Sequence, residues 1–174
     1  MGTKLKSFMQ IALARTRYIG TPPPPIVPFA DWDYYYLFKD LEWKSDAPVE
    51  GAVNEVKVPA GFVTDLASIP DELWSVLPPA ARYSYPAIVH DYLYWFQTCE
   101  RVQADTVFKA AMEDLKVTAG KIMVIYNAVR LAGGTSWDAN AKAKAIGERR
   151  VLKKYPPDVL TTWTIWKQQP DVFA

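Results

Sequence analysis

One histidine and one aspartate stand next to each other inside the most apolar stretch of this chain. His90 is the only histidine among 174 residues, and Asp91 follows it within residues 87–96, which are otherwise apolar or aromatic. A helix that is hydrophobic on all sides is normally buried, and burying an imidazole and a carboxylate is costly unless both are hydrogen-bonded or bind a metal ion. The pair therefore predicts a functional polar site, with a purely structural histidine as the alternative.

Asp105 is the candidate partner of His90. It lies on the apolar stripe of the next predicted helix, where hydrophobic residues recur every three or four positions. At 1.5 Å per residue, His90 lies about 10 Å before the end of its helix and Asp105 about 8 Å into the next. If the two helices pack antiparallel, the side chains meet, and the carboxylate fixes the imidazole tautomer and leaves a general base. Otherwise Asp105 lies at the margin of the stripe and reaches solvent.

Asp65 and Asp91 are the candidate metal ligands. Asp65 lies in an irregular segment that leaves the predicted sheet, where backbone carbonyls are available, and Asp91 projects about 100° around the helix from His90. Two carboxylates with loop carbonyls suit a hard cation such as calcium. One histidine and one cysteine, Cys99, do not provide a structural zinc site or the four-ligand site of the usual His/Asp phosphohydrolases.

The elements that must position these residues predict an α+β fold. We expect a small antiparallel β-sheet at residues 35–65, with strands at 35–43 and 53–58 joined near 45–52, and then a mainly α-helical part that contains an antiparallel two-helix core. Thr98 is a plausible helix cap, and Gly133-Gly134 is a plausible helix stop. The expected helices start at Pro70 and end before Pro78, and then cover residues 86–97, 100–116, 121–131 and 140–154.

Length and composition predict a single domain over residues 1–174. We divide it into an N-terminal segment with a proline-rich connector (1–30), a core (35–133) and a helical C-terminal extension (134–174). The net charge of +1 does not favour nucleic acid as the partner, and no apolar run reaches the roughly 20 residues of a membrane span. The first 17 residues have too short an apolar core for a convincing signal peptide.

The motifs around these residues occur in a recognisable order. The segment VPAGFVTDLASIP (58–70) is followed by HDYLY (90–94), by an Arg101-x-x-Ala-Asp105 pattern and by Val129-Arg130-Leu131. Over residues 35–133 this order resembles an uncharacterised domain family that is common in phages and prophages. The family commonly has arginine where this chain has Asp71. The resemblance implies a phage or prophage protein, found in the host cytoplasm or in the virion, and implies no activity.

A second resemblance covers about 45 residues. The pattern His90-Asp91-x-x-Tyr94, followed by Arg101 and Asp105, is similar to the helix pair of calcium-dependent phospholipases of the A-two type. It implies that His90 activates water, that Asp105 and Tyr94 hold His90, and that Asp91 binds calcium. Asp65 stands where the calcium loop of those enzymes precedes the first helix, although their flanking cysteines and glycine-rich loop are not present in the sequence.

Three hypotheses follow. The first is a calcium-dependent hydrolase of an ester or lipid acyl group, with His90, Asp105 and Tyr94 as catalytic residues and Asp65 and Asp91 as metal ligands. The second is a metal-free variant with Ser68 as the nucleophile. The third is a non-catalytic phage virion component, in which the polar cluster is a structural brace and Tyr34–Tyr36, the proline run, Trp163 and Trp166 bind neighbouring phage proteins.

Overall fold

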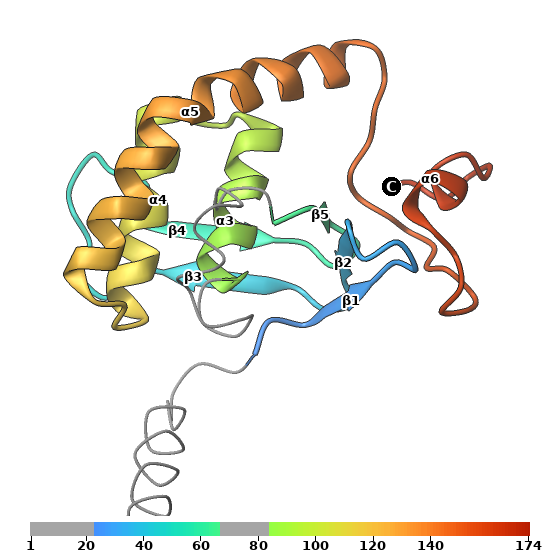
Figure 1. Cartoon of the computed structure of the whole chain (residues 1–174), viewed down its shortest axis with the longest axis horizontal. Helices are drawn as coiled ribbons and strands as arrows, with labels where there is room; N and C mark the ends of the chain where they lie inside the picture. Colours follow the sequence, from blue (N-terminus) through green and yellow to red (C-terminus); the bar gives the residue numbers. More distant parts are fainter. Residues whose placement is uncertain (1–22, 67–83) are drawn as a thin grey trace, which may run out of the picture.

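The computed structural model describes residues 23–66 and 84–174, and these residues form an α+β fold, as predicted. Two small antiparallel sheets lie beside a group of helices (Figure 1). One sheet contains β1 (Ile26–Pro28), β2 (Tyr35–Leu37) and β5 (Val63–Thr64) in the order β1-β2-β5; the other pairs β3 (Leu41–Lys44) with β4 (Glu55–Val58). The helices in the described part are α3 (Ser84–Phe96), α4 (Arg101–Asp114), α5 (Ala119–Ala145) and α6 (Trp163–Trp166).

The β3–β4 hairpin follows the alternation in its sequence. Leu41 pairs with Val58 and Trp43 with Val56, and all four side chains are buried, while the residues between them face solvent. The prediction of one strand over residues 35–43 was wrong, because residues 38–40 interrupt it. β2 pairs with β1 and β5, whereas β3 belongs to the other sheet. The Asp40 side chain accepts a hydrogen bond from the backbone N–H of Ala60 at this change of sheet.

β1 comes from the proline-rich connector and lies at the edge of its sheet. Pro28 is paired with Tyr35 there, which is consistent with the rule that proline is confined to edge strands. The predicted helix that starts at Pro70 falls outside the described residues, as do residues 1–22. No helix in the described ranges is long and apolar enough to cross a membrane.

Helices α3 and α4 form the predicted two-helix core, joined by residues 97–100. α3 begins at Ser84 rather than Pro86, and α4 at Arg101. The expectation that Thr98 caps α4 was wrong. Glu100 precedes the helix instead, and its N–H donates to the side-chain oxygen of Gln103, which is half of a capping box.

α5 is one continuous helix of 27 residues, where two helices separated by Gly133-Gly134 were predicted. It rises beside α4 and then crosses above α3 (Figure 1). The stop signal is Gly147, whose positive φ of 93° and the bond from Glu148 N–H to the Ala143 carbonyl make a Schellman ending. The predicted helix over 140–154 therefore ends at Ala145, and the helical part of the tail is the short α6.

The chain after α5 returns to the sheet. The Val63 N–H donates to the Arg150 carbonyl, and the Leu152 N–H donates to the Gly61 carbonyl. Gly61 has φ +83°, and a Cβ there would lie 2.0 Å from the Leu152 carbonyl oxygen, so only glycine allows this approach. The pairing brings Arg150 next to β5, α3 and the candidate site.

Candidate functional site

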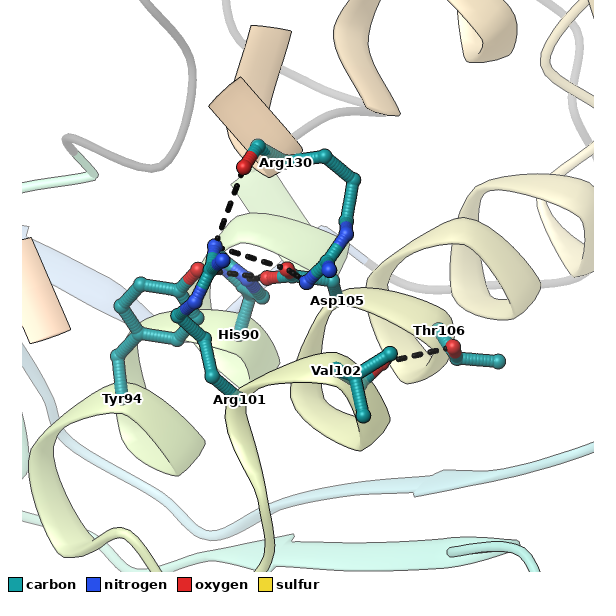
Figure 2. A network of polar contacts seen from close by, with 7 residues as sticks. All are labelled: His90, Tyr94, Arg101, Val102, Asp105, Thr106 and Arg130. Atoms are coloured by element: carbon teal, nitrogen blue, oxygen red, sulfur yellow. Dashed lines mark hydrogen bonds and ion pairs between the residues drawn. The ribbon is translucent and has the colours of Figure 1, made fainter. Parts of the chain in front are cut away.

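The centre of the site is the carboxylate of Asp105, which has no exposed surface. Its Oδ1 accepts hydrogen bonds from His90 Nε2 at 2.9 Å and from the Tyr94 hydroxyl at 2.6 Å. Its Oδ2 accepts one from Arg130 Nη1 at 2.6 Å and a longer one from Arg101 Nη1 at 3.4 Å. Figure 2 shows these four donors converging on the one acidic group. The predicted contact between His90 and Asp105 is therefore confirmed.

Three helices supply this network, and the spacing on each explains the convergence. His90 and Tyr94 are four residues apart on α3, and Arg101 and Asp105 are four apart on α4, so each pair lies on one helix face. Arg130 reaches Asp105 from α5, and its backbone carbonyl also accepts a hydrogen bond from Arg101 (Figure 2). The network therefore ties α3, α4 and α5 together at one point.

Burial keeps the His90 imidazole neutral. The side chain is 1 % exposed and stacks on the ring of Phe108 at 4.7 Å. Removal from water lowers the pKa of His90 more than the neighbouring Asp105 raises it. Because an ionised carboxylate only accepts hydrogen bonds, Nε2 of the neutral ring carries the proton and Nδ1 is the basic nitrogen.

Asp105 stays ionised at its buried position. Burial alone would raise the pKa of this carboxyl, but the hydrogen bonds from His90, Tyr94 and Arg130 lower it to about 2. Burial and the bond to Asp105 also raise the pKa of Tyr94, so its hydroxyl remains a donor. The arrangement is a fixed anion with an oriented neutral base next to it.

His90 lines a pocket of about 310 Å³ between α3, α5 and β5. Its volume is at the lower end of the range for small-molecule sites. Its lining is mixed: apolar and aromatic side chains predominate, with a few polar and charged groups among them. The lining residues are Phe62, Val63, Asp65, His90, Asp91, Tyr94, Trp95, Val129, Ala132, Gly133, Ser136, Ala139, Asn140 and Arg150.

The two candidate metal ligands both line this pocket. Asp91 accepts a hydrogen bond from the Thr64 hydroxyl, and Asp65 lies 3.8 Å from Nη1 of Arg150. Within residues 23–66 and 84–174, no three or more His, Cys, Asp or Glu side chains form a group that could hold a metal ion. A cation at Asp65 and Asp91 would therefore depend on backbone carbonyls or water for its other ligands.

The sequence analysis named Arg101 and Arg130 only as parts of motifs, without a role in the site, and did not name Arg150. Arg101 precedes Asp105 by four residues, so helical spacing was a usable signal. For Arg130 and Arg150 no spacing indicated a contact with the site, because they approach from α5 and from the extended segment after it. The expectation for Trp163 changes, because this side chain is 1 % exposed and is a core residue rather than a surface contact. Ser68 lies outside the described residues, so its proposed role as a nucleophile stays a prediction.

Comparison with known proteins gives one result. Residues 40–129 match the family described as protein of unknown function (DUF1353). The chain belongs to this family. No curated protein and no solved structure gives a significant match. The DUF1353 match includes His90, Asp91, Tyr94, Asp105 and the start of α5, whereas Arg130, Gly133 and Arg150 follow it.

Acid should weaken the fold through His90. Because its pKa is lowered in the folded state, the unfolded chain binds the proton more tightly, so stability is complete above pH 6.5 and falls as the pH decreases below that value. We expect the free energy of unfolding to fall by up to about 1.4 kcal/mol per pH unit in this window. Urea titrations at pH 8 to 5 measure this slope.

The control for this prediction is His90→Asn, which leaves the chain without histidine. It should have a flat profile between pH 8 and 5. A loss of stability below pH 4 should remain, because Tyr94 and Arg130 still lower the pKa of Asp105. A slope of equal size in both proteins would show that another group carries the pH dependence.

Two adjacent glycines test the packing of Tyr94. A Cβ at Gly133 would lie 2.4 Å from the Tyr94 hydroxyl, whereas a Cβ at Gly134 would meet nothing within 4 Å. Gly134→Ala should therefore stabilise α5 by up to ~1 kcal/mol. Gly133→Ala should instead cost about 1–3 kcal/mol, because Tyr94 must move away from Asp105. Equal melting temperatures for the two variants would contradict this packing.

Proposed function

We propose that this protein is a hydrolase of a small ester or lipid acyl group, with His90 as its general base. The observation that carries the proposal is the neutral imidazole of His90 at the wall of a pocket, held by Asp105 through Nε2. A base of this kind must be unprotonated near neutral pH and fixed in one tautomer, and His90 meets both requirements.

In the proposed reaction, His90 moves the proton and Asp105 orients His90. Nδ1 of His90 accepts a proton from a water molecule as the water oxygen bonds to the acyl carbon. Collapse of the tetrahedral intermediate breaks the bond to the leaving alkoxide, which takes the proton back from the imidazolium. Asp105 remains ionised throughout, because its pKa is about 2, and it stabilises the imidazolium while Tyr94 holds the carboxylate in place.

The pocket restricts the substrate. A volume of about 310 Å³ with walls that include Phe62, Trp95 and Val129 suits a short acyl chain or the end of a longer one. Similarity of the His90–Tyr94 and Arg101–Asp105 patterns to phospholipases of the A-two type supports an acyl ester as the substrate. This sequence similarity is an argument separate from the size and lining of the pocket.

The second candidate function is that of a structural brace in a phage or prophage virion. The observation that favours it is the number of donors on Asp105: His90, Tyr94, Arg101 and Arg130 all bind this one group and join three helices. The resemblance of residues 35–133 to a phage and prophage family supports this setting, whether or not the protein is an enzyme.

Activity of His90→Asn separates the two functions. If His90 is the base, wild-type protein should hydrolyse p-nitrophenyl butyrate or release fatty acid from phospholipid vesicles, and His90→Asn should lose a factor of ~10²–10⁴ in rate while remaining folded. Lys109→Gln, on the solvent side of α4, is the control and should keep full activity. A wild type that is inactive on both substrates, with His90→Asn merely less stable, would support the brace.

Calcium is a separate proposal, and no step above passes through it. When bound at Asp65 and Asp91, the ion would add positive charge to the pocket, next to Arg150. Calcium binding should raise the free energy of unfolding by ~2.7 kcal/mol at a hundredfold excess over its dissociation constant, and Asp91→Asn should abolish the effect. An unchanged wild-type melting temperature in millimolar calcium would exclude this site.

A further inference from the structure

Arg150 is the cation in the pocket that the proposed reaction leaves without a role. The C-terminal segment carries it past β5, where its side chain is largely buried. Its guanidinium lies over the ring of Trp95 at 4.9 Å and near that of Tyr34 at 5.4 Å. Stacking on both rings limits the orientations of the planar group, so its donors have a defined direction.

The donors of Arg150 are mostly unused by the protein. Nε donates to Glu148 at 3.1 Å, and the 3.8 Å between Nη1 and Asp65 is an ion pair that is too long for a hydrogen bond. Within the described residues, this is the one hydrogen bond that the guanidinium donates, although the group has five N–H bonds. Arg150 also lines the same pocket as His90. Its Nη groups are therefore available to an acceptor on a bound molecule.

The charges around Arg150 limit what that acceptor is. Glu148 and Asp65 contact the guanidinium, and Asp91 is a third carboxylate at the same pocket. One cation among three acids does not attract a preformed anion such as phosphate or a carboxylate. It can still donate hydrogen bonds to a neutral carbonyl oxygen, and these strengthen as that oxygen becomes negative during attack.

We infer that Arg150 binds the carbonyl oxygen of a neutral acyl substrate and stabilises the oxyanion that forms when water activated by His90 attacks. This inference rests on the proposed function and adds a second catalytic residue to it. Arg150 lies beyond the DUF1353 match, so this part of the site comes from the chain's own C-terminal segment. The positive charge required by the reaction is then supplied by the protein.

Kinetics in the presence of EDTA test the catalytic part. Wild type should hydrolyse p-nitrophenyl butyrate without calcium, and Arg150→Met should lose ~10²–10³ in kcat with KM changed far less. Arg150→Lys keeps the positive charge and the aliphatic part of the side chain. It should recover only part of the lost kcat, because an ammonium group lacks the paired N–H donors of the planar guanidinium. Arg149→Met, at the exposed neighbouring position, is the control and should match wild type.

Unchanged activity in Arg150→Met, or a wild type active only with calcium, would overturn the role of Arg150 and leave the hydrolase intact.

Binding tests the recognition part without turnover. Acetanilide, a neutral amide, and benzoate, an anion, are titrated into isotope-labelled protein while the Trp95 indole and Arg150 Nε signals are followed. Acetanilide should shift both signals in wild type and bind at least tenfold more weakly to Arg150→Met. Glu148→Gln removes one acid and should increase the affinity for benzoate.

The two proposals can fail separately. If acetanilide binds through Arg150 but no ester is hydrolysed, the hydrolase fails and carbonyl recognition stands. Tighter binding of benzoate than acetanilide by wild type, or no binding of acetanilide, would overturn the inference.

Discussion

The structure depends on one buried negative charge. An isolated carboxylate with no exposed surface would cost several kcal/mol, and Asp105 is tolerated because donors from α3, α4 and α5 bind both of its oxygens. Each donor fixes the helix that carries it, so the relative positions of the three helices follow from satisfying this group. Removing one partner would leave a buried polar group with fewer hydrogen bonds, so each member of the network contributes to stability through the others.

The same constraint shapes the pocket. α5 passes close to the Tyr94 hydroxyl that donates to Asp105, and Gly133 allows this because it has no side chain. α5 can then continue over α3 and form a wall of the pocket with Val129 and Asn140. The requirement for a satisfied carboxylate and the requirement for an open space beside His90 are therefore met by one packing arrangement.

The site combines two parts of the chain with different origins in the fold. His90 and Asp91 come from α3, Asp105 from α4 and Asp65 from the residue after β5, whereas Arg150 arrives through the pairing of residues 150–152 with residues 61–63. The pocket therefore receives its polar groups from two separate parts of the chain. A hydrolase and a structural brace would share the first part and differ in their need for the second.

The sequence alone determined the α+β class, the β3–β4 hairpin, the α3–α4 pair and the contact between His90 and Asp105. These depend on local periodicity and on helical spacing, which place residues on faces before any packing is known. Tertiary structure decided the rest. Gly133 was read as a helix stop, but packing against Tyr94 keeps it helical and Gly147 ends α5. Arg130 and Arg150 join the site across separations of 25 residues from Asp105 and 85 from Asp65. Local sequence patterns do not predict these contacts, because they form only when α5 packs against the buried Asp105 and the C-terminal segment pairs with residues 61–63.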